Sequence, residues 1–398
     1  MNSMFKKRRK KQNKSKVIQT KKKNKNKISR NIFHVDGASD RVLFGVVGIL
    51  TLFGVLMISS AGIVYADVRF DDPYFFFKRQ LIGVVLGFLG LFVFSNIDYH
   101  FYRKWALVIF GGALVLLFVV LMPGVGTEAY GANRWIAIGP MSFQPSEFMK
   151  LALILYVAAW CAGKGKKIIT DFQDGLMSFL LILGVACFLV LLQPDVGTTA
   201  MLGFIAVGMF FLAGARMSHI GMIAGIGLAG LILLIAMAPY RMARFTTFIN
   251  PENDLQGTGY QIQQALIAIG SGGMFGLGLG HSKQKGLYLP EPVGDSIYAI
   301  IAEELGMIGA IAVLVLFVVF ALRGLKIAAN APDMFGKLIA GGITVWIVGQ
   351  AIINIAAITA LMPLTGIPLP FISYGGTSIV FTLISVGILL NISKQAKT

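Results

Sequence analysis

Charged residues are scarce in this sequence, and so are cysteine and histidine. Only 13% of the 398 residues are Asp, Glu, Lys or Arg, whereas a soluble domain carries charge on about a quarter of its residues. This shortage argues against a soluble globular protein. The two cysteines, Cys161 and Cys187, have no CxxC spacing and indicate no disulfide framework. The four histidines are scattered, so no zinc-type cluster is recognisable.

Apolar residues are abundant, at 56% of the chain, and they gather in blocks of about 20 residues, the length needed to cross a bilayer. The sequence therefore predicts an all-α polytopic membrane protein with about ten transmembrane helices. The predicted spans are 42–64, 81–96, 105–122, 147–162, 176–192, 197–214, 219–238, 296–320, 337–360 and 376–391.

The positive charge is concentrated at the N-terminus. Residues 1–30 contain 14 of the 35 Lys and Arg and no acid. With so little apolar content, 1–38 is predicted to be a disordered basic tail, and 39–398 a single membrane domain. The tail is too long and too polar for a signal peptide. We interpret it as a topology signal that also touches anionic lipid, because nothing else in the chain indicates nucleic-acid binding.

The charges also predict an orientation. An even number of spans returns the C-terminus to the side of the N-terminus, and the Lys and Arg of several short loops fall on that side too, so both termini are predicted to be cytoplasmic. The longest connection, 239–295, lies between the seventh and eighth spans and is then extracytoplasmic. A connection of that length with little regular pattern is usually functional.

Several polar residues stand close to the predicted outer ends of the spans. Trp135, next to Arg134, could be an anchor in the aromatic belt. Glu147 and Lys150, at i and i+3 on one helix face, indicate either a structural ion pair or a site, because charges in a span are costly. Asp195, in QPDVGTT, is either a turn residue or a site residue.

The long connection carries a second group of candidates. Arg241 and Arg244 open it, and a Gly-rich run, 270–280, follows, which either presents backbone N–H groups to phosphate or allows close helix packing. Lys285 comes next. Asp295 stands where the eighth span begins, and its structural alternative is an N-cap.

Prolines and glycines are dense just before the last span, in PLTGIPLPFISYGGTS at 363–378. This density requires non-helical backbone. At membrane depth such backbone is tolerated only inside the protein or beside a water-filled cavity.

Four motifs together resemble the SEDS family (shape, elongation, division and sporulation) of bacterial peptidoglycan glycosyltransferases. They are GANRWI with QPSEFMK, QPDVGTT, GSGGMFGLGLGHSKQKGLYLPEPVGDSIYAIIAEELG, and PLTGIPLPFISYGGTS, and they occur in this order. The resemblance covers about 40–395. The GLGLG-x-S-x-QK form is more similar to the division and sporulation branch (FtsW, SpoVE) than to the elongation branch (RodA). Family members often read HTDFIF where this chain reads VGDSIY, so the acid is kept and its neighbours are not.

The resemblance implies polymerisation of lipid II into glycan strands at the outer face of the cytoplasmic membrane, at the division septum, with Asp295 as the catalytic acid. A carboxylate can take the proton of the attacking sugar hydroxyl, and cations can stabilise the leaving pyrophosphate. The expected substrate-binding residues are Arg134, Trp135, Glu147, Lys150, Asp195, Arg241, Arg244 and Lys285.

The expected partners are lipid II, a class B penicillin-binding protein that acts as transpeptidase, and other membrane proteins of the division machinery. The chain has no S-x-x-K followed by a K-T-G of its own. A divalent cation, Mg or Mn, could share the work of the cations, although no dedicated ligand cluster is recognisable. Two alternatives are a lipid II flippase and a non-catalytic scaffold. The clustering of ionisable residues at the outer ends of the spans argues against the flippase. The scaffold would leave four residues without a role: Glu147, Lys150, Asp195 and Asp295.

Overall fold

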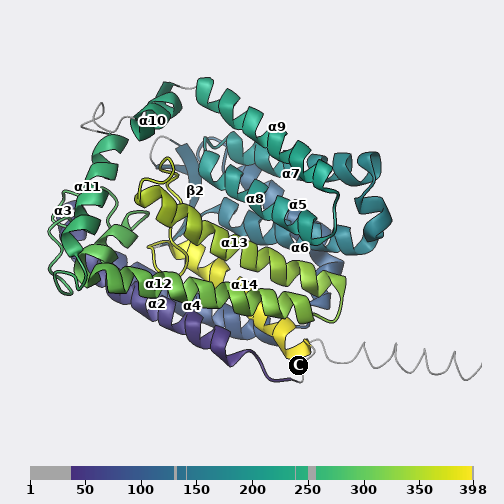
Figure 1. Cartoon of the computed structure of the whole chain (residues 1–398), viewed down its shortest axis with the longest axis horizontal. Helices are drawn as coiled ribbons and strands as arrows, with labels where there is room; N and C mark the ends of the chain where they lie inside the picture. The colour runs from purple at the N-terminus through teal and green to yellow at the C-terminus, as the bar shows by residue number, and fades with distance from the viewer. Residues whose placement is uncertain (1–36, 130–131, 140, 238, 250–256, 397–398) are drawn as a thin grey trace, which may run out of the picture.

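The structure is a computed structural model that describes residues 37–129, 132–139, 141–237, 239–249 and 257–396. The described chain is mainly helical (Figure 1). Its helices are α2 (Arg41–Ala61), α3 (Ile63–Phe70), α4 (Phe75–Asn96), α5 (His100–Val119), α6 (Pro145–Ile169), the π-helix η1 (Phe172–Met177), α7 (Ser178–Leu191), α8 (Val196–Leu212), α9 (Met217–Ala236), α10 (Pro239–Ile249), α11 (Thr258–Gly272), α12 (Ile297–Asn330), α13 (Met334–Ile358) and α14 (Gly376–Gln395).

Nine helical segments within the described residues are long and apolar enough to cross a bilayer, and the apolar helix α8, with 17 residues, is slightly shorter. Counted with α8, they are the ten predicted spans. The bounds differ most at α12, which continues to Asn330 rather than 320, then at α6, which continues to Ile169 rather than 162, and at α4, which begins at Phe75 rather than 81. Polar residues such as Lys78 and Arg323 interrupt the apolar pattern there without ending the helix.

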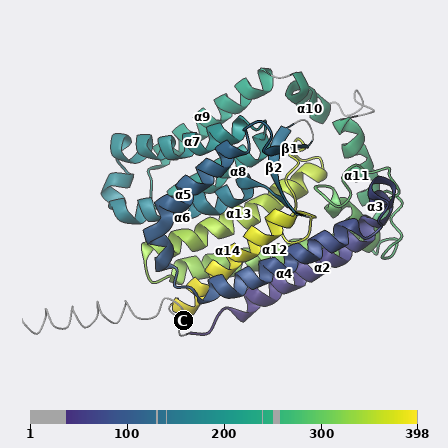
Figure 2. The same ribbon diagram turned by 180° about the vertical axis from the view of Figure 1, so that it is seen from behind.

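The bundle has a protein-packed centre and a periphery open to lipid. In α13 and α14, 72% and 67% of the apolar span is buried inside the protein, against 11% in α9. Figures 1 and 2 accordingly show α13 and α14 in the middle and α9 along one edge. Small residues allow close packing at the centre: a Cβ added to Gly87 of α4 would lie 2.5 Å from a methyl carbon of Leu383 on α14.

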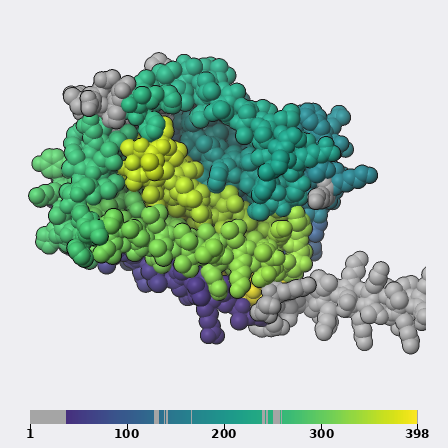
Figure 3. All heavy atoms as spheres, in the orientation of Figure 1, coloured from purple at the N-terminus to yellow at the C-terminus, as the bar shows by residue number. Residues whose placement is uncertain are grey.

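The segment between α9 and α12 was expected to be an irregular loop, and that expectation was wrong in part. Its described residues include α10 and α11, which continue from α9 as an arch at one end of the bundle (Figure 1). Figure 3 shows the surface hollowed between this arch and the yellow-green segment that precedes α14.

A small sheet lies in the connection between α5 and α6, where no strand was predicted. Strands β1 (Gly126–Ala129), β2 (Ala132–Ile138) and β3 (Met141–Phe143) pair antiparallel in the order β1-β2-β3. The strands are too short for the alternation of side chains to stand out in the sequence. The prediction of an all-α membrane domain is confirmed for the bundle, with this sheet as an addition at its end.

The two ends of the described chain meet at the other end of the bundle. The backbone N–H of Asp40 donates to Ser393 Oγ at 3.1 Å. The first and last spans therefore begin and end on one side, as an even number of spans requires. The predicted tail, 1–38, lies outside the described residues except for its last two.

Candidate functional site

Asp295 lies in a turn that precedes α12, and two helices from elsewhere in the sequence hold it. The side-chain amide of Gln261, on α11, donates to Asp295 Oδ1 at 3.2 Å and to Ser296 Oγ at 3.0 Å. The amide of Asn354, on α13, donates to the Asp295 backbone carbonyl at 2.9 Å. Asp295 is not the N-cap of α12, because Ser296 takes that position. The structural alternative considered for Asp295 is therefore wrong.

The Pro-rich segment before α14 packs against this turn. As predicted, it is non-helical and lies largely inside the protein, with Leu369, Phe371 and Ile372 buried. The N–H of Tyr374 donates to the Val293 carbonyl at 2.8 Å, which ties the segment to the Asp295 turn. Burial raises the pKa of the Tyr374 phenol, so this group remains neutral at physiological pH.

A shallow surface recess lies where the turn, α13 and the Pro-rich segment meet. Its lining consists of Asp295, Asn354, Ala357, Ile358, Leu364, Thr365, Gly366 and Ile367. The recess combines one carboxylate with neutral polar groups and an apolar wall, and no lysine or arginine among the described side chains lines it.

Glu147 and Lys150, on the first turns of α6, form an ion pair inside the protein. Lys150 Nζ lies 2.7 Å from Glu147 Oε1. The Lys150 side chain is only 3% exposed and the Glu147 side chain only 5%. Lys150 also donates to Gln350 Oε1 at 3.0 Å. Gln350 stands one helical turn before Asn354 on α13, so the pair lies beside the recess wall, but neither member lines the recess. Their predicted role in substrate binding remains a prediction.

Arg134 and Asp195 meet at the start of α8, and both have structural partners there. Arg134, on β2, donates to the carbonyls of Gln193 and Pro194, both at 2.8 Å. The Asp195 carboxylate caps α8 by accepting from the N–H and hydroxyl of Thr198, at 2.9 and 2.8 Å. Trp135 follows Arg134 on β2 and is partly buried. The first two motifs of the sequence are thus brought together in space.

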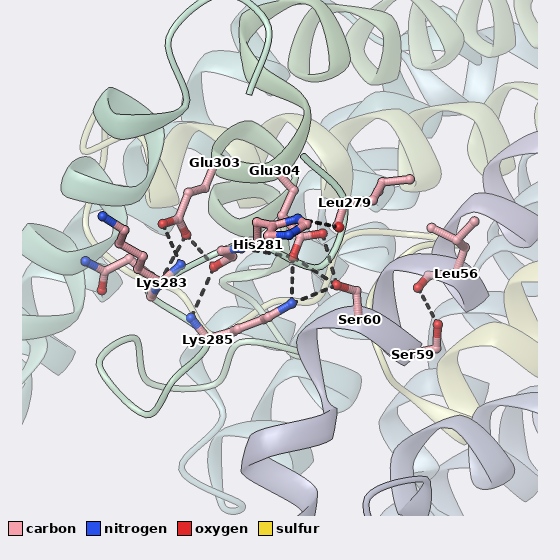
Figure 4. A network of polar contacts seen from close by, with 11 residues as sticks. Leu56, Ser59, Ser60, Leu279, His281, Lys283, Lys285, Glu303 and Glu304 are labelled. Carbon is pink, nitrogen blue, oxygen red and sulfur yellow. Dashed lines mark hydrogen bonds and ion pairs between the residues drawn. The ribbon is translucent and has the colours of Figure 1, made fainter. Parts of the chain in front are cut away.

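Lys285 is not among the residues that line the recess, and its side chain points into a buried polar network (Figure 4). Its ammonium lies 2.9 Å from Glu304 Oε1 and 3.1 Å from Ser60 Oγ, and the Glu304 side chain is fully buried. Glu303 accepts from the backbone N–H of Lys283 at 2.9 Å and from the Ser282 hydroxyl. The sequence places these two adjacent acids inside a span, where a charge is costly unless it is paired. This cost was the signal that Glu303 and Glu304 have partners in the fold.

The Gly-rich run fits into a break in α12. At Gly306 the helix has a non-helical backbone, with φ 68° and ψ −168°. The carbonyls of Glu303 and Glu304 accept from the N–H groups of Leu277 and Gly278, at 2.9 and 3.0 Å, and Met307 donates to the Gly273 carbonyl at 2.8 Å. Of the two interpretations of the run, the structure therefore supports close packing. Arg241 and Arg244 lie on α10, but their side chains lie outside the described residues.

Comparison with known proteins gives consistent matches over the membrane domain. The family model FTSW_RODA_SPOVE, described as cell cycle protein, matches residues 40–398. The stage V sporulation protein E of Bacillus subtilis (strain 168) is 44% identical, over 90% of this chain and 98% of the relative. A probable peptidoglycan glycosyltransferase FtsW of Geobacter sp. (strain M18) is 40% identical, over 90% of this chain and 97% of the relative.

Solved structures show the same architecture. One similar chain comes from a peptidoglycan synthase complex described as coordinating polymerization and crosslinking, with a TM-score of 0.75, 26% identity, and coverage of 89% of this chain and 98% of that chain. The rod shape determining protein RodA of Thermus thermophilus has a TM-score of 0.66 and 26% identity, with coverage of 91% of this chain and 98% of that chain.

Proposed function

The chain belongs to the FtsW, RodA and SpoVE family of cell cycle proteins, and we propose that it polymerises lipid II into glycan strands as a peptidoglycan glycosyltransferase. Lipid II carries its sugars on an undecaprenyl pyrophosphate. A substrate with such a tail reaches an enzyme most directly from within the bilayer, which fits ten apolar spans. The proposed place of action is the outer face of the membrane, at the division septum.

The observation that carries the proposal is the placement of Asp295. Its carboxylate lines a recess, its backbone is held by Asn354, and Gln261 donates to one of its oxygens. In the proposed reaction a hydroxyl of one sugar attacks the anomeric carbon of another. The new C–O bond forms as the bond to the pyrophosphate breaks, the leaving oxygen keeps the electron pair, and Asp295 takes the hydroxyl proton.

The pyrophosphate needs positive charge, since its oxygens gain charge in the transition state. Lys150, Lys285 and Arg134 already have protein partners, so we assign this role first to Arg241 and Arg244 on α10. The other predicted contacts, Trp135, Glu147 and Asp195, remain part of the proposal as groups that shape the surrounding wall.

A divalent cation, Mg or Mn, also remains part of the proposal, because such an ion could neutralise the pyrophosphate. Among the described residues, no three His, Cys, Asp or Glu side chains lie close enough together to hold an ion. The residues described therefore do not form a dedicated metal site, and no step of the mechanism above passes through an ion.

We propose a class B penicillin-binding protein as the partner that crosslinks the strands, together with other membrane proteins of the division machinery. One structural relative is a chain of a peptidoglycan synthase complex described as coordinating polymerization and crosslinking. The present sequence has no S-x-x-K followed by a K-T-G, so crosslinking by a serine transpeptidase needs a second protein.

The test compares wild type with Asp295→Asn at equal folded amounts in detergent, where transport across a bilayer has no meaning. The substitution keeps an oxygen that accepts from Gln261 but removes the basic carboxylate. Polymer formation from lipid II, with and without the partner, should fall about a hundred- to ten-thousand-fold. Unfolding temperature should change little, because the Asp295 side chain does not cap α12.

Equal polymer from the two forms would remove Asp295 from the mechanism. No polymer from the wild type, even with its partner, combined with lipid II translocation in liposomes, would favour the flippase.

A further inference from the structure

Two oxygens in the recess beside Asp295 have no hydrogen-bond partner among the described residues. They are Asn354 Oδ1 and Thr365 Oγ1, and both atoms are buried. Asn354 as a residue is only 2% exposed, and both residues line the recess. A buried polar atom without a partner costs free energy, so two of them beside a reactive carboxylate indicate a group that is bound during the reaction.

The orientation of the Asn354 amide is fixed by its partners. Its nitrogen lies 2.9 Å from the Asp295 carbonyl and 2.8 Å from the Ile367 carbonyl. Both partners can only accept, so the nitrogen must face them and the oxygen must be the atom without a partner. Asn354 Oδ1 can therefore only receive a hydrogen-bond donor.

The recess is unsuited to an anion. Its polar groups are the Asp295 carboxylate, the Asn354 carbonyl oxygen and the Thr365 hydroxyl, and its lining, as far as the structure describes it, includes no lysine or arginine. A phosphate would meet an anion and an acceptor there. Hydroxyl groups, in contrast, can donate to both oxygens, and the apolar wall of Ala357, Ile358, Leu364 and Ile367 suits the C–H face of a sugar.

We propose that this recess is the subsite for the attacking sugar, with Asn354 and Thr365 as its specificity-determining residues. This inference rests on the proposed function and assigns one of its two sugar positions. The attacking hydroxyl gives its proton to Asp295, and its oxygen bonds to the anomeric carbon of the other sugar. A neighbouring hydroxyl of the same attacking sugar donates to Asn354 Oδ1, and Thr365 Oγ1 hydrogen-bonds to the same group of hydroxyls.

The assignment separates the two halves of the reaction in space. In the proposed function, Arg241 and Arg244 on α10 bind the pyrophosphate of the donor. Binding of the donor should therefore not depend on Thr365. A change at Thr365 should therefore weaken use of the acceptor while donor binding persists.

The informative substitution is Thr365→Val, which has nearly the same shape and lacks the hydroxyl. Because Thr365 Oγ1 has no partner within the described part of the chain, its removal breaks no hydrogen bond there and should leave the unfolding temperature unchanged or slightly higher. In lipid II polymerisation, kcat/KM should fall about two- to tenfold, the effect of one lost neutral hydrogen bond to substrate. Thr365→Ser, which keeps the hydroxyl, should recover most of the rate.

Thr51 offers a matched control. It is a buried threonine on α2 whose hydroxyl also has no partner in the described ranges, and it is not among the residues that line the recess. Thr51→Val should leave kcat/KM unchanged.

A second measurement identifies the sugar. Lipid II derivatives that lack one hydroxyl next to the attacking one, each in turn, are compared in wild type and Thr365→Val. For one derivative, the loss of activity caused by the missing hydroxyl and the loss caused by Thr365→Val should be non-additive, because both changes remove the same hydrogen bond.

Wild-type activity with no loss in Thr365→Val would overturn this inference and leave the proposed function standing. Strict additivity for every derivative would also overturn it, and so would a loss in Thr365→Val that added Mn²⁺ or Mg²⁺ restores, since that would make the recess a cation site. A wild type that makes no polymer would instead refute the proposed function itself.

Discussion

The Glu147–Lys150 pair places two charges where water has almost no access. The two atoms that form the pair are 2.7 Å apart, and Lys150 gains further contacts with Gln350 and, at 4.9 Å, with the ring of Trp346. Attraction and desolvation nearly cancel in such a pair, but a single charge left behind has only the desolvation cost. The pair therefore acts as a unit at the junction of α6 and α13.

Removing one member should harm the protein more than removing both. Lys150→Met alone should cost about 3–5 kcal/mol of stability, because it leaves Glu147 charged and buried. The double substitution Glu147→Leu with Lys150→Met should cost clearly less. Unfolding temperatures of the single and double variants in detergent measure this.

If Lys150→Met unfolds at the wild-type temperature but loses polymerisation, the pair binds substrate and the structural interpretation is wrong. If both single variants keep full activity and stability, neither role is supported.

Individual residues of the site were predictable to the extent that their chemistry is costly in a membrane. The Glu147–Lys150 pair stood out for this reason, whereas the role of Asp295 was predicted from the resemblance to the family. Gln261 and Asn354 did not stand out, because neutral amides are common in any sequence and their partner lies 34 and 59 residues away. Lys285 was predicted to bind substrate, and this remains a prediction. The contacts of its ammonium with Glu304 and Ser60 could not be predicted, because only the fold brings these residues together.

At the scale of elements, the break in α12 connects the membrane bundle to the loop that carries Asp295. The break frees backbone groups on both sides of Gly306, and the run from Gly273 to Gly278 supplies their partners. Backbone that leaves the helix at membrane depth is tolerated where its freed groups are paired again inside the protein, as the carbonyls of Glu303 and Glu304 and the N–H of Met307 are here. The side chains of Glu303 and Glu304 then hold residues 282–285 (Figure 4), so one end of α12 anchors the start of the segment that leads to Asp295.

Gly306→Ala should disrupt this junction. Gly306 has a positive φ, and an added Cβ would lie 2.4 Å from the backbone nitrogen of Gly276. The strained backbone alone costs about 1–3 kcal/mol, and the contact with backbone adds to it. We expect a lower unfolding temperature and reduced polymer yield per folded molecule.

Gly203→Ala on α8 is the control, because nothing lies within 4 Å of a Cβ added there. This change should be neutral or stabilising, since Ala is the better helix former. A Gly306→Ala protein with the stability and activity of Gly203→Ala would show that the break does not hold the loop.

The spans were predictable because a run of apolar residues is the dominant signal in the sequence. The helices of the long connection were not, since α10 and α11 carry polar residues and have no pattern strong enough to separate them from a loop. The close packing of the Gly-rich run was one of two open interpretations. It depended on a break inside α12, at a residue that looks like any other glycine of a membrane helix.

At the scale of the whole molecule, the two ends of the bundle differ in kind. One end brings together the sheet, the arch of α10 and α11 and the Asp295 recess (Figures 1 and 2). The other end brings Asp40 next to Ser393, and there Arg323 forms an ion pair with Asp40 at 2.9 Å. Whichever side of the membrane holds one terminus must hold the other, and the recess must open toward the opposite side.

The charge of the chain determines which side is which. The 14 Lys and Arg of residues 1–30 should stay in the cytoplasm, where anionic lipid and the membrane potential retain them. We therefore predict that single cysteines at positions 5 and 396 react with a membrane-impermeant maleimide only after the cells are permeabilised. A cysteine at position 255, between α10 and α11, should react in intact cells.

The background for this experiment lacks Cys161 and Cys187, which removes the only native thiols. Labelling of position 5 or 396 in intact cells would reverse the orientation and place the recess on the cytoplasmic side, where it could not extend glycan strands outside the cell. Different results at 5 and 396 would contradict more than the orientation. The hydrogen bond between Asp40 and Ser393 requires that the first and last spans share a side, so such a result would refute the arrangement of the bundle itself.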